Sequence, residues 1–522
     1  MRKLLIGSLF MFFLGFVLSQ CKTQSKSTEV REELSGEELS KLYCVACHKY
    51  PEPALLNKAT WNDYVLVRMA AYLGIYTDNN SYFGKMPDRW VEPGLGGERV
   101  RNAKVYPEKP LLAVKEWESI RDYYLDSAPE KLAKNPDKLD IKIGLPFFEE
   151  SKFNQLNLLS PHVQSIAFDT VNQRIYAGGL GENIYEFDSK GRQRSIAKSE
   201  SYVVDIKRVR DQIYVLDMGT RIASDNPAGS LTKMQTIKDF GTPEAELVLS
   251  QLMRPVHFEI TDFNLDGKDD FVVSEYGNLL GALNVYMSSS RGYDRVTLLE
   301  EDGAIRTELR DINNDGQLDI LALMGNANEG VDQYINNGNG GFVKERLVEF
   351  DASFGSTHFT AVDWNHDGKQ ELLYSNGDNG DYLPLMKPYH GIRLYIDNGG
   401  GFEEKFFIPM NGVYQAEAAD LDLDGDMDIV AVSFHPDHQN DMKESFQVFM
   451  NDGDDTFSAF TISEYDQSRW MRFLLEDIDR DGDLDIILTA MNIKTPEISN
   501  EISNKWEESE KAMLLIRNMN QR

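Results

Sequence analysis

The sequence predicts a two-domain chain, in which a small all-α domain is followed by an all-β propeller of seven blades. Three observations lead to this fold class. The 522 residues are more than one hydrophobic core usually holds. A Cys-x-x-Cys-His motif near the N-terminus follows residues with the apolar spacing of a helix. Five acidic loops recur in the second half at intervals of about 50 to 57 residues, which is the length of one four-stranded blade.

Residues 1–21 are predicted to form a lipoprotein signal peptide, and residues 22–35 a linker. Two basic residues precede an apolar run over residues 4–18, which is too short to span a membrane comfortably. Cys21 follows this run at the place where a lipid would be attached. The alternative is plain secretion, with Cys21 removed or incidental. In both cases the chain is expected to be exported.

The Cys-x-x-Cys-His motif lies just after a helix that a capping box of Ser35 and Glu38 predicts. Two thiols three residues apart lie on one helical face and can add to both vinyl groups of a haem, and the next His can bind the iron. A redox dithiol or half a zinc site would also use two cysteines. The adjacent His, the export signal and the lack of a second Cys pair favour haem, so residues 36–132 are expected to be a cytochrome c domain with one covalent haem c. The residues that would hold the haem are Cys44, Cys47 and, as an axial ligand, His48.

After a second linker at residues 133–146, residues 147–522 are predicted to form the propeller. Each acidic loop offers oxygen ligands at positions 1, 3, 5 and 9, a backbone carbonyl at position 7, and a Gly for the sharp turn at position 6. Hard cations take such ligands, and calcium suits their flexible arrangement. Position 12 never holds the Glu of an EF-hand, and a β pattern follows each loop. About five calcium ions are expected, because the crowded carboxylates would otherwise repel one another. The predicted ligands are Asp262, Asn264, Asp266, Lys268, Asp270, Asp311, Asn313, Asp315, Gln317, Asp319, Asp363, Asn365, Asp367, Lys369, Glu371, Asp420, Asp422, Asp424, Asp426, Asp428, Asp477, Asp479, Asp481, Asp483 and Asp485.

Two further blades are predicted before these five, over residues 162–200 and 201–250. Both segments show strand patterns but lack the acidic loop. The last blade is one strand short at the C-terminus, and residues 147–158 resemble the outer strands of other blades. We expect this segment to supply the missing strand and close the ring, which removes exposed sheet edges.

The acidic loops resemble FG-GAP or VCBS-type repeats, the calcium-loop blades that are also found in integrin heads. Together with the haem motif, the whole layout resembles exported proteins of Bacteroidetes-type bacteria that pair a cytochrome c segment with such repeats. The resemblance implies a propeller, haem c and calcium as cofactors, and a periplasmic or outer-membrane lipoprotein of a Gram-negative bacterium. It implies no settled reaction.

The second axial haem ligand is open between Met69 and Met86. A loop Met before the last helix is usual in small cytochromes c, which favours Met86. An Arg-Met pair, as at Met69, occupies this place in exported proteins of similar layout. Either side chain could instead fill the core. A thioether ligand would raise the reduction potential and suit electron transfer. The domain is expected to close with a helix that carries Trp117, Ile120 and Tyr124 on one face.

A polar residue stands five positions before the first Asp of every acidic loop. This offset belongs to the innermost strand of a blade, so these side chains are expected to line the central channel. They could bind an anionic or hydroxyl-rich ligand; the alternative is a hydrated channel with structural hydrogen bonds. Two loops, at residues 378–393 and 434–438, are also unusually rich in side chains that could bind a ligand. The two His of the second loop could bind a metal. The predicted channel residues are His257, Arg306, His358, Gln415 and Arg472, with Glu259, Glu308, Thr360, Glu417 and Leu474 two positions further on.

The formal net charge of −31 argues against nucleic-acid binding, which needs a basic surface. The expected function is electron transfer by an exported haem c lipoprotein, whose propeller binds a substrate or partner. Its partner would be a redox protein or a small electron donor, and its membrane contact the N-terminal lipid alone. One alternative is an oxidoreductase, a quinone-dependent propeller dehydrogenase that reduces the fused haem. Another is an adhesion or scaffold protein. No catalytic residue is singled out.

Overall fold

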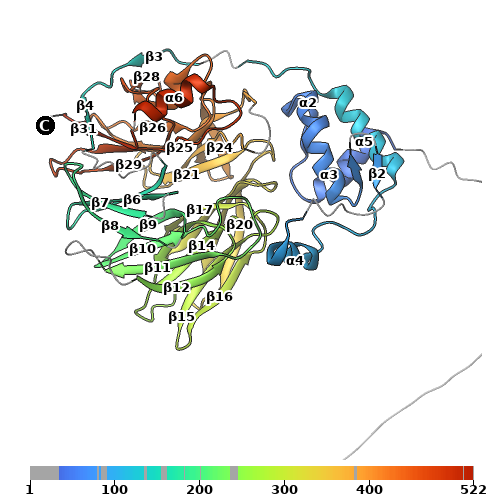
Figure 1. Cartoon of the computed structure of the whole chain (residues 1–522), viewed down its shortest axis with the longest axis horizontal. Coiled ribbons are helices and arrows are strands. Elements are labelled where there is room, and N and C mark those ends of the chain that lie inside the picture. Colours follow the sequence, from blue (N-terminus) through green and yellow to red (C-terminus); the bar gives the residue numbers. More distant parts are fainter. Residues whose placement is uncertain are drawn as a thin grey trace, which may run out of the picture.

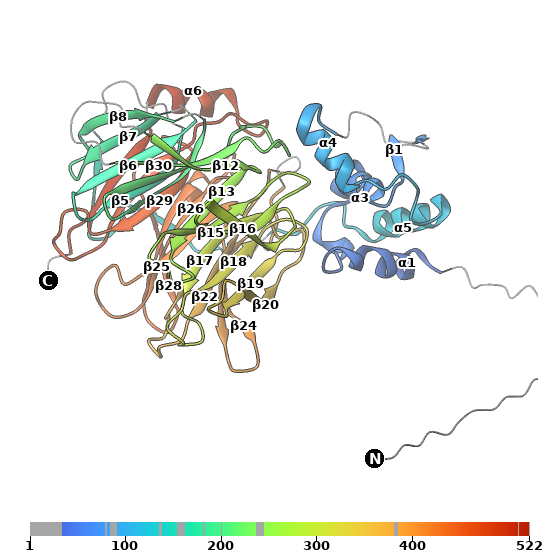
Figure 2. The same ribbon diagram turned by 90° about the horizontal axis from the view of Figure 1, so that it is seen from below.

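The computed structural model describes residues 34–78, 81–83, 91–134, 138–153, 162–180, 183–199, 201–235, 245–380, 385–509 and 511–520. A helical domain lies beside a seven-bladed propeller, and two views at right angles show the separation clearly (Figures 1 and 2). The predicted lipid site at Cys21 and the predicted haem ligand Met86 lie outside the described residues.

The helical domain is built around one small apolar core. Its first helix begins at the predicted capping box, in which the backbone N–H of Glu38 donates to Ser35 Oγ and that of Ser35 to the Glu38 carboxylate. The predicted closing helix is α5, and its three predicted core residues are buried. The domain was expected to be purely helical, but a short antiparallel hairpin interrupts it. Its elements are α1 (Gly36–Tyr43), the 3-10 turns η1 (Cys44–Ala46) and η2 (Pro53–Leu55), α2 (Lys58–Thr60), the π-helical turn η3 (Trp61–Val65), α3 (Leu66–Tyr72), β1 (Tyr76–Asp78), β2 (Ser81–Phe83), α4 (Gly94–Ala103) and α5 (Val114–Ser127).

The propeller consists of seven antiparallel sheets, as the sequence predicts. The two blades without acidic loops come first. Blade 1 holds β5 (Val163–Asp169), β6 (Arg174–Gly179), β7 (Asn183–Asp188) and β8 (Gln193–Lys198). Blade 2 holds β9 (Val203–Val209), β10 (Gln212–Asp217), β11 (Gly229–Gln235) and β12 (Ala245–Leu252). Blade 3 holds β13 (Pro255–Thr261), β14 (Asp270–Glu275), β15 (Ala282–Ser289) and β16 (Gly292–Leu299). Blade 4 holds β17 (Ala304–Arg310), β18 (Asp319–Met324), β19 (Gly330–Asn336) and β20 (Phe342–Glu349).

The last three blades continue this scheme, with additions at the outer edge. Blade 5 holds β21 (Ser356–Val362), β22 (Glu371–Asn376), β23 (Gly391–Asp397) and β24 (Phe402–Pro409). Blade 6 holds β25 (Val413–Ala419), β26 (Asp428–Ser433), β27 (Phe446–Asn451) and β28 (Phe457–Thr461). Blade 7 holds β29 (Trp470–Glu476), β30 (Asp485–Ala490), β31 (Met513–Asn518) and, from the other end of the chain, β4 (Phe148–Lys152). A 3-10 turn η5 (Met442–Ser445) and helix α6 (Asn500–Ser509) decorate these blades.

Strand burial follows the position of the strand in the blade. The second strands, such as β14, β18 and β26, are buried along their whole length because neighbouring blades cover both of their faces. Outer strands such as β16 and β20 are largely exposed and carry the charged residues. The core therefore lies between the blades, where apolar side chains from adjacent sheets interlock.

Ring closure is confirmed, because β4 pairs antiparallel with β31 and supplies the outer strand of blade 7. The preceding segment, predicted as a linker at residues 133–146, is more ordered than expected. Its residues 141–143 form β3 (Ile141–Ile143), which pairs in parallel with the edge of β28 and makes a fifth strand of blade 6. Lys138 also pairs with the buried carboxylate of Glu444. The reason is that an unpaired sheet edge offers backbone partners to any nearby extended chain.

The two faces of the propeller carry different features. In each blade the turn from the first to the second strand lies at one end of the sheet, so the five acidic loops share one face, here called the loop face. The turns from second to third strand, and the links between blades, lie at the opposite end, here called the domain face. Contacts of the helical domain fall on the domain face: Lys49 pairs with Asp351 at 3.1 Å, and the Tyr389 hydroxyl donates to the Leu55 carbonyl at 2.9 Å.

A second anchor of the helical domain is Glu92, just before α4. Its carboxylate accepts hydrogen bonds from Ser224 Oγ at 2.7 Å and from the backbone N–H of Asp225 at 2.6 Å. Both partners lie between β10 and β11, so blades 2, 4 and 5 all contribute to the docking surface. No helix among the described residues is long and apolar enough to cross a membrane.

Candidate functional site

The Cys-x-x-Cys-His motif begins where α1 ends. Cys44 opens the 3-10 turn η1, and neither Cys44 nor Cys47 is in a disulfide. His48 is half-buried, and its Nδ1 lies 2.8 Å from the carbonyl oxygen of Lys49. A carbonyl can only accept, so Nδ1 carries the proton and Nε2 is left with the lone pair that binds a metal. Metal-binding imidazoles commonly make this second contact, and the motif therefore fits a covalent haem with His48 as axial ligand.

The surroundings of the motif also fit a flat apolar cofactor. Leu42 and Val45 are 58% and 51% exposed, which leaves large apolar side chains uncovered beside the thiols. Cys44 is half-buried, and burial raises the pKa of its thiol to about 11. Of the two candidate second ligands, Met69 is half-buried on α3 and packs against the core of the helical domain. The choice between Met69 and Met86 stays open.

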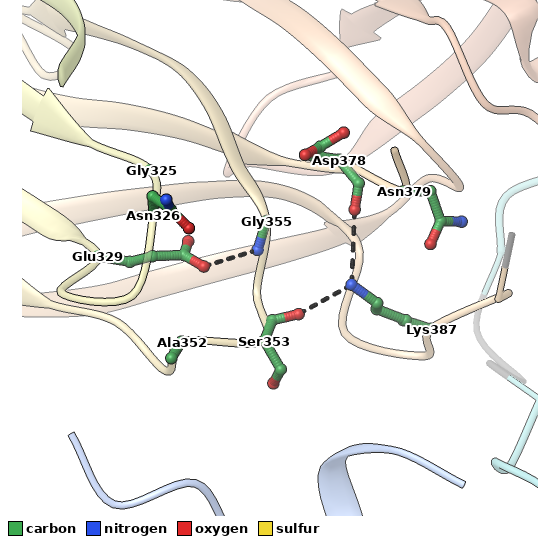
Figure 3. Close-up of a pocket in the computed structure, with 9 residues that line it drawn as sticks. All are labelled: Gly325, Asn326, Glu329, Ala352, Ser353, Gly355, Asp378, Asn379 and Lys387. Carbon is green, nitrogen blue, oxygen red and sulfur yellow. Dashed lines mark hydrogen bonds between the residues drawn. The ribbon is translucent and has the colours of Figure 1, made fainter. Parts of the chain in front are cut away.

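A small pocket lies on the domain face between blades 4 and 5 (Figure 3). Glu329 is buried there and accepts hydrogen bonds from the backbone N–H groups of Gly355 and Ser356. Burial raises the pKa of the Glu329 carboxyl to about 7. Lys387 is also buried and donates to two backbone carbonyl groups, at Ser353 and Asp378. The pocket is polar and adjoins the docking surface, since Asp351 and Tyr389 flank its lining residues.

The five acidic loops share one backbone geometry. In the loop of blade 3, Leu265 at position 4 has φ of +57° and Gly267 at position 6 has φ of +83°. The Asp262 carboxylate accepts the backbone N–H groups of Asp266 and Gly267, and Asp266 accepts that of Lys268. The same bonds from position 6 to position 1, and from position 7 to position 5, recur in the other four loops. Each loop is thus folded around the oxygens of positions 1, 3 and 5.

Two loops bring three carboxylates together. Oxygen atoms of three acidic side chains lie within 4.8 Å of one another in blade 6 and again in blade 7. In blade 6, burial and then its neighbours Asp424 and Asp420 raise the pKa of the Asp422 carboxyl. The loops of blades 3, 4 and 5 have Asn at position 3, whose amide oxygen would take the same place. These groups could hold a metal ion, and their all-oxygen donor set fits calcium. The two clusters are Asp420, Asp422, Asp424 and Asp477, Asp479, Asp481.

The acid at position 9 has a second role that the sequence did not reveal. Asp428, the first residue of β26, is 1% exposed. It accepts hydrogen bonds from the backbone N–H groups of Leu421 at 2.9 Å and Asn451 at 2.8 Å. It thereby ties the loop to the third strand of its own blade. The same pair of bonds recurs at Asp270, Asp319 and Asp485.

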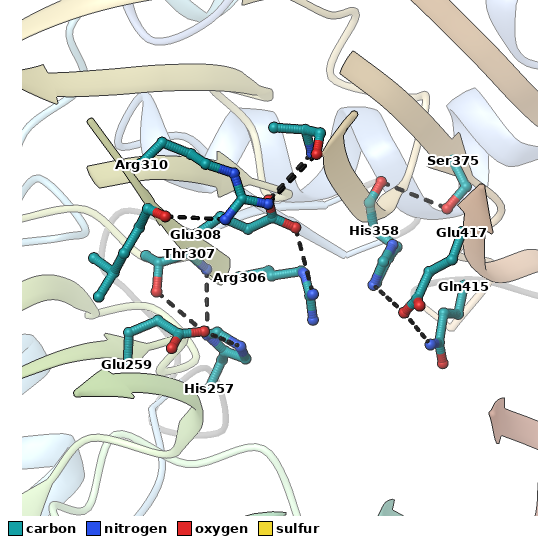
Figure 4. A network of polar contacts seen from close by, with 12 residues as sticks. His257, Glu259, Arg306, Thr307, Glu308, Arg310, His358, Ser375, Gln415 and Glu417 are labelled. Carbon is teal, nitrogen blue, oxygen red and sulfur yellow. Dashed lines mark hydrogen bonds and ion pairs between the residues drawn. The ribbon is translucent and has the colours of Figure 1, made fainter. Parts of the chain in front are cut away.

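The central channel carries a ring of seven polar residues, here called the channel ring, and Figure 4 labels four of them, His257, Arg306, His358 and Gln415. Each lies on the first strand of a blade, opposite the fifth residue of the second strand. Five were predicted from the offset to the acidic loops. The two missed members come from the blades without such loops, where that landmark is absent. The channel ring consists of Ser165, Asp205, His257, Arg306, His358, Gln415 and Arg472.

Two positions further along the strands, nearer the loop face, lies a second charged layer. Lys207 pairs with Glu259 at 2.9 Å, and Glu308 pairs with Arg310 at 2.9 Å. Burial alone would lower the pKa of Lys207, but Glu259 and Asp205 raise it. Burial raises the pKa of Asp205, and the Glu259 charge adds to this effect. The channel is therefore lined by groups of both signs. The charged members of the second layer are Lys207, Glu259, Glu308 and Glu417.

The histidine loop at residues 434–438 does not form a metal site in the described part of the chain. His435 and His438 are both buried, against the expectation for a surface loop. The guanidinium of Arg469 lies 3.2 Å from His435 Nδ1, and it would repel a bound cation. His438 packs against the ring of Trp506. Arg469 is buried, and its guanidinium donates to the carbonyl of Phe434 in this loop and to that of Ile493. Buried donors need such partners, so these bonds hold the loop in the core.

A comparison with known protein families supports the repeat. Residues 311–374 match the family described as FG-GAP-like repeat. The matched segment runs from the acidic loop of blade 4 through that of blade 5, so the chain contains an FG-GAP-like repeat within a seven-bladed propeller. No curated protein matches the chain.

Solved β-propellers are also similar at low identity. Saccharomyces cerevisiae Sqt1 aligns with a TM-score of 0.43 and 11% identity over 68% of this chain and 83% of that chain. The WD40 β-propeller domain of Doa1 aligns with a TM-score of 0.44 and 8% identity over 71% and 97%. The Dos1 propeller aligns with a TM-score of 0.39 and 10% identity over 70% and 80%. Similarity at this level says nothing about ligand or activity.

Proposed function

We propose that this chain is an exported electron-transfer protein, in which a haem c domain is docked on a propeller that binds a substrate or partner. The observation that carries the proposal is the geometry of His48, whose Nδ1 proton is directed to the Lys49 carbonyl so that Nε2 can bind iron. Haem c would supply a one-electron couple at this place. The predicted signal and Cys21 would export the chain and hold it to a membrane by lipid.

The docking surface supports a joint role for the two parts. Lys49, next to the axial His48, pairs with Asp351 of the propeller. The helical domain contacts blades 2, 4 and 5 on the domain face, beside the polar pocket of Glu329 and Lys387. A substrate or partner bound at this face would lie close to the haem motif. The electron donor would be a redox protein or a small molecule, and the formal net charge of −31 argues against nucleic acid as a partner.

Calcium is proposed for the acidic loops of the loop face. Bound calcium would offset the repulsion among clustered carboxylates. Asp363 and Asp420, both at position 1, each have one buried carboxylate oxygen without a hydrogen-bond partner in the described structure. An unpaired buried carboxylate oxygen is costly, and a cation is the natural partner for it.

The decisive experiment is expression of the full chain in a host that matures c-type cytochromes. We expect covalent haem that stays on the chain under denaturing electrophoresis, and its loss in the Cys44→Ala/Cys47→Ala variant. His48→Ala should keep the covalent link but change the absorption spectrum, because only the axial ligand is removed. A wild-type chain without covalent haem would refute the proposal.

A second arm distinguishes a carrier from a dehydrogenase. Substrate-dependent haem reduction, with or without added quinone, would assign oxidoreductase activity to the propeller. Reduction by a chemical donor alone would leave an electron carrier.

A further inference from the structure

We propose that the central channel binds a small hydroxylated carboxylate, of the sugar-acid class, at the layer formed by the channel ring. This inference rests on the ligand-binding part of the proposed function and not on the haem. It names the class of ligand and the residues that would hold it.

Arg472 is the first indication of an anion. Its guanidinium makes no hydrogen bond or ion pair with any described residue, and its Nε atom is buried. Its guanidinium lies 5.3 Å from the ring centre of Tyr414, which holds it in place without neutralising it. Arg306 has one long ion pair, at 3.5 Å from Glu308, and its Nε lacks a hydrogen-bond partner. Burial alone would lower its pKa, but the surrounding carboxylates raise it and keep the group charged. A guanidinium group whose N–H donors lack partners inside a protein can form paired hydrogen bonds with a carboxylate.

His358 is the second, independent indication. It is 1% exposed, and neither ring nitrogen has a hydrogen-bond partner among the described residues. Its Nε2 lies 3.9 Å from Glu417, beyond hydrogen-bond reach. Burial lowers the pKa of His358 well below its usual value, and Arg306 and Arg472 lower it further, so both guanidinium groups act on this neutral ring. A neutral imidazole can both donate to and accept from a hydroxyl group.

The charges of several blades act on His257 in the same part of the channel. After burial, the charges of Lys207, Arg306 and Arg472 lower its pKa well below the usual value. Arg306 comes from blade 4 and Arg472 from blade 7, so their charges meet across the channel axis. Figure 4 shows the Arg306 side chain extending into the space between His257 and His358.

The second layer selects against a simple inorganic anion. Glu259, Glu308 and Glu417 lie one step deeper, and Asp205 belongs to the ring itself. These four carboxylates lie among the cations Lys207, Arg306, Arg310 and Arg472. A compact multiply charged anion such as phosphate would therefore be repelled by the carboxylate oxygens next to the arginines. A monoanionic carboxylate with several hydroxyl groups matches both layers, because it can pair with the arginines and donate hydroxyl protons to the deeper carboxylates.

The channel ring lies on the side of the domain face. The first strand of each blade runs from the domain face to the loop face, and the ring residues occupy the first half of these strands. The acid group of the ligand would therefore point toward the face that carries the helical domain. The hydroxyl groups would reach toward the loop face.

The test is calorimetric titration of the calcium-loaded full chain with glucuronate, glucose, acetate and inorganic phosphate. We expect glucuronate to bind at least about tenfold more tightly than the other three, because only it offers both an anion and hydroxyl groups. Arg472→Gln and Arg306→Gln should each weaken glucuronate binding by about tenfold or more. Arg291→Gln, which removes the same charge at an exposed turn, should have no effect.

Four outcomes would overturn the proposal. They are absence of glucuronate binding to the wild-type chain, equal binding by Arg472→Gln, phosphate binding as tight as glucuronate binding, or equal loss in Arg291→Gln. If a glutamine variant fails to fold, Arg472→Lys keeps the charge and should still lose affinity, because lysine cannot form the paired bond. The readout does not involve haem, so failure here is separate from failure of the proposed electron transfer.

Discussion

Replacing Asp428 separates the structural role of the acidic loops from their proposed metal role. The Asp428 carboxylate accepts two buried backbone N–H groups, from Leu421 and Asn451. In Asp428→Ala both donors lose their partner inside the blade. Each buried donor without a partner costs about 1–3 kcal/mol. The expected loss is therefore about 2–6 kcal/mol in the free energy of unfolding of the propeller, with or without calcium.

The matched control is Asp420→Asn at position 1 of the same loop. Asp420 accepts one N–H, from Gly425, and an amide oxygen can still accept it. This variant should lose only the stabilisation that calcium provides, and it should equal wild type in chelator. The assay is denaturant unfolding followed by tryptophan fluorescence, in calcium and in EDTA. The reasoning is refuted if Asp428→Ala and Asp420→Asn unfold at the same midpoint in EDTA, since position 9 would then act through the metal alone.

Two further variants test the docking surface and a titrating group near it. Glu92→Ala removes the acceptor of the hydrogen bonds from Ser224 and Asp225, so docking of the helical domain should lose about 2 kcal/mol. We therefore expect the Asp225 amide hydrogen to exchange with solvent about 30-fold faster. Glu98→Ala, at an exposed position of α4, should leave this exchange unchanged. Asp302 has its pKa raised to about 6 by burial, so its contribution to stability is present below about pH 4 and is lost as the pH rises to 6. Asp302→Asn should therefore stabilise the chain by up to about 3 kcal/mol at pH 7 and by nothing near pH 4. The measurement is thermal unfolding at both pH values. An equal effect at both would contradict the raised pKa of Asp302.

Predictions that depend on residues close together in the chain were confirmed. The capping box of Ser35 and Glu38, the buried face of α5 and the seven-bladed architecture all follow from the spacing of neighbouring residues. The acidic loops set the blade period, and through it the five channel residues. The Cys-x-x-Cys-His motif is local in the same way, because covalent haem attachment needs thiols at a fixed short separation, and its haem stays a prediction.

Contacts between segments far apart in the chain could not be predicted from the sequence. The addition of β3 to blade 6 depends on an open sheet edge more than 300 residues away along the chain. The burial of His435 depends on Arg469, which comes from the next blade.

The sequence by itself determined the blade repeat, the Cys-x-x-Cys-His motif and the acidic loops, because each depends on the chemistry of residues close together in the chain. Only the tertiary structure decided that the helical domain sits on the face opposite the acidic loops, through Glu92, Lys49 and Tyr389. Only the closed ring brings Arg306, His358 and Arg472 to one channel, since each comes from a different blade. Their spacing in sequence reflects the blade period, whereas their convergence is a property of the circle that the blades form.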